Sequence, residues 1–225
     1  MDSTKPSILI LLGGLWHDFE GFADSARALF AGQGYRVEAT YNLDSLQWLE
    51  RAGFDLVLSY TSLSEHRPGM DDRSPEGLSE TQVSGLLEWL QKGGGLLGVH
   101  CATVTGKSDA RLEKLLGGAF VSHPEPFSFT VMPLSGEHPI TAKVPAFEIH
   151  DEFYLQKYDP SVQVHMAATY QERIHPMVWS RLEGRGKVAV IAPGHFPAVW
   201  AHATYRQLLL QSAGWLINKT SGNQP

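Results

Sequence analysis

The sequence predicts an α/β domain with a mostly parallel central sheet, on three observations. The first half of the chain alternates short apolar runs with segments of helical periodicity. Strands that alternate with helices imply right-handed crossovers, which set the strands side by side and parallel. The chain has 225 residues, of which 43% are hydrophobic and 19% charged, enough for one substantial core. Since no linker or change of composition separates the halves, we expect a single domain over residues 1–225, ordered from about 7 to 219.

The elements of the first half follow from local signals. Residues 8–12 form a continuous apolar run, as expected for a strand covered on both faces. Residues 19–31 have apolar side chains at helical spacing and end before Gly32, which suits a helix stop. Ser79 is placed to cap a helix that extends to residue 92. The other elements expected in this half are strands at 35–40, 54–59 and 96–99 and a short helix at 46–51.

The second half predicts strands that are separated by turns. A closing helix is expected at 205–217, where the sequence carries an apolar stripe. The segment 61–78 contains charges, two prolines and two glycines without any periodicity, and we expect either a lid over a site or a mobile loop. The strands expected in this half are 127–132, 162–168, 177–182 and 187–191.

Composition narrows the classes of partner. The formal net charge is −6 with no basic run, which argues against a nucleic acid. No apolar stretch reaches the roughly 20 residues that a membrane helix needs, and the single cysteine, Cys101, excludes an internal disulfide. Residues 7–15 resemble the apolar core of a secretory signal, but no small-residue cleavage site follows them, so we predict a buried strand there. We therefore expect a cytoplasmic protein with a small-molecule partner. The sequence leaves open whether the chain forms a homo-oligomer.

Three histidines follow glycine-containing exits from predicted strands. His17 comes after the strand at 8–12, His100 after the strand at 96–99, and His195 after the strand at 187–191. Ligands of open parallel sheets bind beyond the carboxyl ends of the strands, so we expect these histidines at one edge. A single histidine is more often a structural or surface residue, whereas three at one edge indicate a site for acid–base chemistry or metal binding.

The stretch Gly98-Val99-His100-Cys101-Ala102 has the small flanking residues of a strained strand-to-helix turn, the kind that presents a nucleophile. Its central residue, His100, is a poor substitute for a serine or cysteine nucleophile. Cys101 lies one step later, where a helix start would lower its pKa. We favour a buried, inert Cys101, because adjacent residues on a tight turn point in different directions.

Acidic and aromatic residues complete the candidate site. Glu152 lies in the run Asp151-Glu152-Phe153-Tyr154 and would orient a histidine or act as acid or base, although a solvated acidic pair on a strand end explains it equally well. Trp16 and Tyr154 are aromatic residues beside these segments, where aromatic side chains are as often part of the core. His123 is followed by Pro124, and a simple chain reversal is enough to explain this His-Pro pair without a functional role.

Taken together, the motifs resemble the ThuA-like family, named for trehalose utilisation and related in fold to class I glutamine amidotransferases. The resemblance covers nearly the whole chain. It is carried by His17-Asp18, GGGLLGVHCA (93–102), LLGGAFVSHP (115–124), EHPIT (137–141), DEFY (151–154), PMVW (176–179), GRGKVAVIAPGH (184–195) and the closing GWLIN. It implies a flavodoxin-like three-layer sandwich, in which His100 takes the position of the amidotransferase cysteine and His195 lies near that of the catalytic histidine. Because histidine cannot form a glutamyl thioester, the residues argue against glutamine amidotransfer.

The resemblance implies sugar catabolism, and the expected function is a hydrolase or lyase acting on a glycoside or keto-glycoside. The alternative is a sugar-binding or regulatory domain without catalysis, which turnover would distinguish. We predict a site without a metal or other cofactor, because no tight local ligand spacing is present; zinc held by the histidines and Glu152 is the alternative. The expected catalytic residues are His100, His195 and Glu152, and the expected substrate-binding residues are Trp16, His17, Asp18, His123 and Tyr154.

Overall fold

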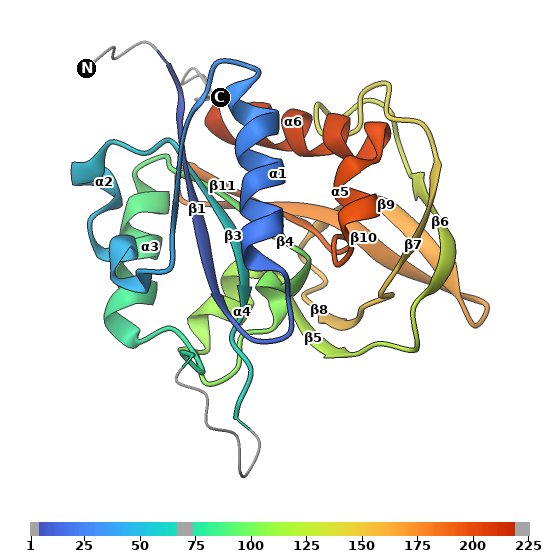
Figure 1. Ribbon diagram of the computed structural model, residues 1–225, viewed down its shortest axis with the longest axis horizontal. Coiled ribbons are helices and arrows are strands. Elements are labelled where there is room, and N and C mark those ends of the chain that lie inside the picture. Colours follow the sequence, from blue (N-terminus) through green and yellow to red (C-terminus); the bar gives the residue numbers. More distant parts are fainter. Residues whose placement is uncertain (1–4, 67–73, 219–225) are drawn as a thin grey trace.

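A nine-stranded sheet runs through the centre of the molecule in the computed structural model, which describes residues 5–66 and 74–218 (Figure 1). The strand order is β2-β1-β3-β4-β11-β10-β9-β6-β7. The strands are β1 (Ser7–Gly14), β2 (Arg36–Thr40), β3 (Leu56–Ser62), β4 (Gly95–Val99), β6 (Phe127–Pro133), β7 (Phe147–Asp151), β9 (Gln163–Tyr170), β10 (Arg173–Glu183) and β11 (Gly186–Ile191).

The sheet has a parallel half and an antiparallel half. The pairs β2–β1, β1–β3, β3–β4 and β4–β11 are parallel, whereas β11–β10, β10–β9, β9–β6 and β6–β7 are antiparallel. The strands β1, β4 and β11 are buried almost throughout, as their continuous apolar runs predict for strands covered on both faces. The apolar run at 7–15 is therefore confirmed as a buried strand.

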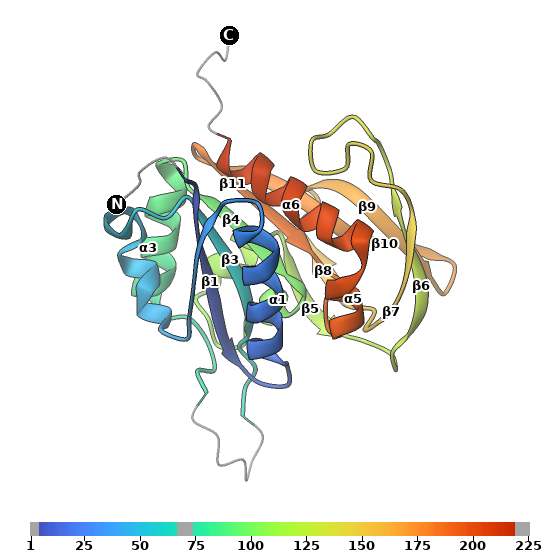
Figure 2. The ribbon, with the colours of Figure 1, turned by 45° about the horizontal axis from the view of Figure 1, so that its top comes forward.

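Helices cover both faces of the sheet and make three layers, which confirms the predicted α/β class. The helices α1 (Phe19–Ala31), α5 (Pro197–Ala201) and α6 (Ala203–Ile217) pack in sequence on one face (Figure 2). The helices α3 (Glu80–Gln91) and α4 (Arg111–Leu116) cover the other. No helix in the described part of the chain has the length and apolar character needed to cross a bilayer.

Local signals at the helix ends agree with the structure. The helix α1 has the predicted bounds. Ser79 caps α3 through a reciprocal capping box with Gln82, which satisfies two amide groups that the first turn leaves unpaired. The helix expected at 46–51 is instead a 3₁₀ turn, η1 (Leu43–Gln47), followed by the one-turn helix α2 (Leu49–Ala52).

Short elements escape the sequence patterns. The strands β5 (Gly118–Ser122) and β8 (Leu155–Tyr158) pair only with each other, and neither shows a clear alternation of buried and exposed residues. The strand β7 and the helices α4 and α5 were also not predicted, since five or six residues carry too few periods to stand out. Part of the segment 61–78, residues 67–73, lies outside the described residues, and the expectation of a lid or mobile loop falls there.

Candidate functional site: a histidine and glutamate cluster

The carboxyl ends of three parallel strands, β1, β4 and β11, bring His17, His100 and His195 together, as the sequence predicts. His17 follows β1, His100 follows β4 at the start of the 3₁₀ turn η2 (His100–Thr103), and His195 follows β11. The ring centroids are 5.1 Å apart for His17 and His100, 4.8 Å for His17 and His195, and 5.4 Å for His100 and His195. No two of these residues are close in the sequence, so the cluster exists only through the fold.

His100 has the backbone geometry expected of the strained turn. Its φ is +46°, in the left-handed region that a non-glycine residue seldom occupies. The side chain is fully buried. Cys101 is also fully buried, and burial raises the pKa of its thiol well above the ordinary value, which disfavours the reactive thiolate.

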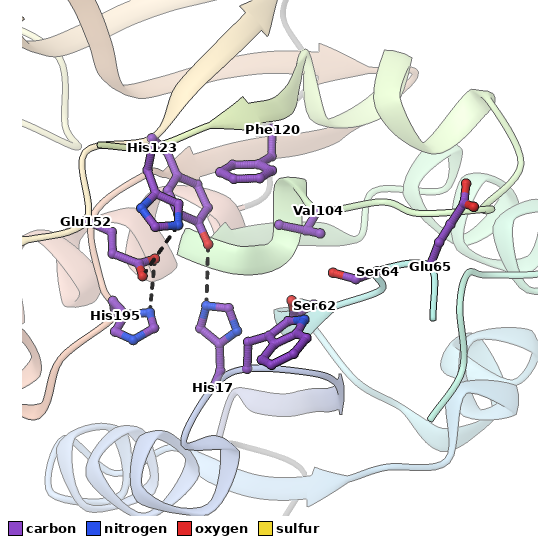
Figure 3. A pocket seen from close by; sticks show the side chains of 11 residues that line it. His17, Ser62, Ser64, Glu65, Val104, Phe120, His123, Glu152 and His195 are labelled. Atoms are coloured by element: carbon purple, nitrogen blue, oxygen red, sulfur yellow. Dashed lines mark hydrogen bonds and ion pairs between the residues drawn. The ribbon is translucent and has the colours of Figure 1, made fainter. Parts of the chain in front are cut away.

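Glu152 reaches the cluster from the antiparallel half of the sheet, where it directly follows the outermost strand, β7. Its Oε2 lies 3.1 Å from His195 Nδ1 and 3.4 Å from His100 Nε2, and its Oε1 lies 3.7 Å from His123 Nε2. Figure 3 shows this carboxylate between His123 and His195. One carboxylate thus faces three imidazoles.

Asp151, the last residue of β7, fixes the loop that carries His195. Its buried carboxylate accepts hydrogen bonds from the amides of Gly194 at 2.6 Å and His195 at 3.1 Å. Two further hydrogen bonds, from Tyr60 Oη at 3.0 Å and Trp200 Nε1 at 2.6 Å, hold the carbonyl oxygen of Gly194. These bonds join the edge strand β7, the strand β3 and the helix α5 around one short loop.

Hydrogen bonds to the backbone determine which imidazole nitrogens face the cluster. His17 Nδ1 lies 2.8 Å from the carbonyl oxygen of Leu15, and His100 Nδ1 lies 2.8 Å from that of Ala192. A carbonyl oxygen only accepts, so in both neutral rings Nδ1 carries the proton and Nε2 presents a lone pair. The Tyr154 hydroxyl then donates to His17 Nε2, at 3.4 Å.

Burial and neighbouring charges favour a neutral His17 and an ionised Glu152. Burial, together with the nearby His100 and His195, lowers the pKa of His17 to about 3, so its imidazole is neutral at physiological pH. Burial alone would raise the pKa of Glu152, but the imidazoles of His100 and His195 outweigh it and hold the pKa well below its usual range. Burial raises the pKa of Tyr154 well above the ordinary value.

A pocket of about 560 Å³ opens above the cluster, within the range of small-molecule sites (Figure 3). Among the predicted site residues, Trp16, His17, His123, Glu152, Tyr154 and His195 line it. The indole of Trp16 is 59% exposed, which suits a stacking surface at the rim.

Two predicted site residues do not line this pocket. His100 lies beneath it, with its ring against that of Tyr154 at a centroid distance of 4.1 Å. Asp18 caps α1, where its side chain accepts a hydrogen bond from the amide of Gly21 at 2.9 Å. A contact between Asp18 and a substrate stays a prediction.

Several residues of the pocket and its support are not indicated by the sequence. Asp151 is turned inward by the alternation of buried and exposed residues along β7 from Phe147 onwards, a pattern too short to stand out in the sequence alone. No pattern in the sequence marks the other lining residues, which are Ser62, Ser64, Glu65, Val104 and Phe120.

Solved structures with the same fold include two ThuA-like proteins. A putative ThuA-like protein from Bacteroides uniformis is 19% identical, with a TM-score of 0.74 over 98% of this chain and 96% of that one. Another, from Parabacteroides merdae, is 15% identical, with a TM-score of 0.76 over 99% and 94%. A β-galactosidase from Rahnella is 15% identical, with a TM-score of 0.67 over 94% of this chain but only 31% of the enzyme. No curated protein matches the sequence at a significant level.

The family itself is shown at the level of sequence. The family model described as ThuA, trehalose utilisation, matches residues 7–216. That range includes the four residues of the cluster and every strand of the central sheet. The resemblance found in the motifs is thereby confirmed, and the chain belongs to the ThuA family.

Proposed function

We propose that this protein is a sugar-modifying enzyme, a hydrolase or lyase that acts on a glycoside or its keto derivative. The observation that carries the proposal is the position of the histidine and glutamate cluster at the floor of a pocket whose rim bears aromatic side chains. Trehalose utilisation, the description of the family, supports a sugar as the substrate class. Glutamine amidotransfer is disfavoured, since His100 stands at the turn and Cys101 is buried.

The chemistry that suits the site is proton transfer. A keto group on a sugar acidifies the neighbouring C–H, so a positioned base and acid can drive elimination of the glycosidic oxygen without a covalent intermediate. Glu152 and His195 line the pocket and are placed to touch a substrate, and Tyr154, which lines the same pocket, adds a hydroxyl donor. His100, which lies below the pocket, is proposed to act by holding Glu152 in place.

A turnover assay tests the proposal. The protein is incubated with oxidised and unmodified disaccharides and glucosides, and products are separated by chromatography and identified by NMR. We expect Glu152→Gln and His195→Ala to lower kcat by about 10²–10⁴-fold. His150→Gln, an exposed histidine on β7, serves as the matched control and should retain full turnover.

Two outcomes contradict the proposal. Turnover that persists in both Glu152→Gln and His195→Ala would place the chemistry elsewhere. Tight retention of a sugar without turnover would favour a binding or regulatory domain on the same scaffold. The cytoplasmic location expected from the sequence stays a prediction.

A further inference from the structure

We infer that the cluster is a binding site for a divalent transition-metal ion, zinc first, held by His17 Nε2, His100 Nε2, His195 Nδ1 and a carboxylate oxygen of Glu152. The inference deepens the proposed function and rests on it only for the sugar substrate. It replaces the metal-free site that the sequence favours with the alternative that the sequence left open.

The spacing of the four atoms fits an ion. All of them lie within 4.8 Å of one another. A tetrahedral zinc ion with bonds of about 2.0–2.1 Å needs ligand atoms about 3.3 Å apart. The two distances to Glu152 Oε2, 3.1 Å from His195 Nδ1 and 3.4 Å from His100 Nε2, already have this value, so small side-chain rotations complete the set.

Two of these atoms lack a partner that their burial demands. His100 Nε2 and His195 Nδ1 are buried, and neither makes a well-aligned hydrogen bond within the described residues, despite their short distances to Glu152. Since the Nδ1 proton of His100 is committed to a carbonyl oxygen, its Nε2 lone pair faces a carboxylate oxygen, and both atoms are acceptors. Two acceptors at this distance need a cation or a proton between them, and a metal ion satisfies all four atoms at once.

The outer contacts are those of metal ligands. Histidines that bind metals usually donate their other N–H to a carbonyl or carboxylate oxygen, which fixes the ring and makes the ligating nitrogen more basic. His17 does so with Leu15, and His100 does so with Ala192, at 2.8 Å each. For His195, Asp151 instead holds the backbone, through a hydrogen bond from the amide at 3.1 Å.

The donor set selects the class of ion. Three imidazole nitrogens and one carboxylate suit zinc and other first-row divalent ions, whereas calcium and magnesium prefer oxygen ligands. Neutral imidazoles with one carboxylate leave a net positive charge on an occupied site. His17, Glu152 and His195 line the pocket and His100 lies beneath it, so an ion among them has its free side toward the pocket.

An open side facing the pocket gives the ion a chemical role. With four protein ligands, an ion there would have to take a fifth ligand from the pocket, as some catalytic zinc sites do in the transition state. It would then polarise the keto oxygen of a bound sugar or lower the pKa of a water molecule, and so replace the imidazole of His195 as the source of acid–base chemistry. The Tyr154 hydroxyl, which contacts His17 Nε2, remains available as a donor at the same place.

The test measures metal directly. Protein with its affinity tag removed is treated with chelator, desalted, and titrated with zinc chloride in a calorimeter, and retained metal is counted by elemental analysis. We expect close to one ion per chain and a higher melting temperature with zinc than with magnesium. His100→Ala and Glu152→Gln should each weaken zinc binding by more than about 10–100-fold, the loss typical of outer contacts alone. His150→Gln is the matched control and should bind zinc as the wild type does.

Cobalt gives a second readout if His100→Ala fails to fold. Tetrahedral cobalt(II) absorbs visible light far more strongly than octahedral cobalt, so the wild type should be coloured and Glu152→Gln, which keeps the shape of the side chain, should lose intensity. Near-zero retained zinc, or unchanged affinity in both variants, overturns the inference. Sugar turnover that is equally fast in metal-free and zinc-loaded protein contradicts only the chemical role of the ion, whereas stoichiometric zinc without turnover of any sugar contradicts only the proposed function.

Discussion

Replacing Asp151 with asparagine should destabilise the protein because both carboxylate oxygens are in use. Oδ2 accepts from the amide of Gly194 at 2.6 Å, and Oδ1 accepts from that of His195 at 3.1 Å, with no exposure to solvent. Asparagine offers one oxygen and one NH₂ group, so one backbone amide must face a second donor. A buried donor without a partner costs about 1–3 kcal/mol, and the loss of the second bond brings the total to about 2–4 kcal/mol.

Chemical denaturation followed by circular dichroism measures this effect. For a chain of this size, a loss of about 2–4 kcal/mol in the free energy of unfolding corresponds to a fall of roughly 4–16 °C in the Tm of a thermal melt. Glu148→Gln is the matched control, since Glu148 is an exposed carboxylate on the same strand and its replacement should change the free energy of unfolding by less than about 0.5 kcal/mol. If Asp151→Asn unfolds within that same margin of the wild type, the amides of the His195 loop do not depend on the carboxylate and the reasoning is wrong.

Three further predictions concern other parts of the chain. The protein should release no ammonia from glutamine, and hydrolysis that disappears in Cys101→Ala would contradict this. Burial and the nearby His138 lower the pKa of His165 to about 4. Between about pH 6.5 and 4 this histidine is therefore protonated in the unfolded chain but neutral in the native protein. The free energy of unfolding should fall by up to about 3 kcal/mol as the pH drops from about 6.5 to 4. This slope, measured by urea titration at several pH values, should flatten in His165→Gln. Gly14→Ala should impair folding, because a Cβ there would lie 1.8 Å from the carbonyl oxygen of Ser62 at a φ of +102°, whereas Gly214→Ala, in a helix with open space around it, should raise the stability by about 0.5–1 kcal/mol in thermal melts.

The parallel half of the fold was predictable from the sequence because its signals are local and strong. Buried strands give continuous apolar runs, and Ser79 marks a helix start through a side-chain bond to a residue three positions later. The meeting of His17, His100 and His195 also followed, since parallel strands place their carboxyl ends at one edge.

The arrival of Glu152 was not predictable in the same way. It follows β7, the edge strand at the far end of the antiparallel half, which packs against α5. Nothing in the sequence near Glu152 encodes this placement, which depends on the pairing of β6 with β7 and β9. The short β5–β8 ribbon that borders the site is set by the same long-range contacts.

The place of β11 has a consequence for how the chain folds during synthesis. Among the strands of the described residues this one is the last to be made, yet it lies in the middle of the sheet, between β4 and β10 (Figure 1). Until it leaves the ribosome, the two halves of the sheet have no shared strand, and both β4 and β10 present unpaired edges that invite pairing with other chains. Its pairing with β10 is a tight hairpin, but its pairing with β4 joins residues far apart along the chain, which makes slow folding the expectation. A nascent chain arrested before residue 186 should therefore bind chaperones or aggregate, and release of the remaining segment should complete the sheet and the pocket together.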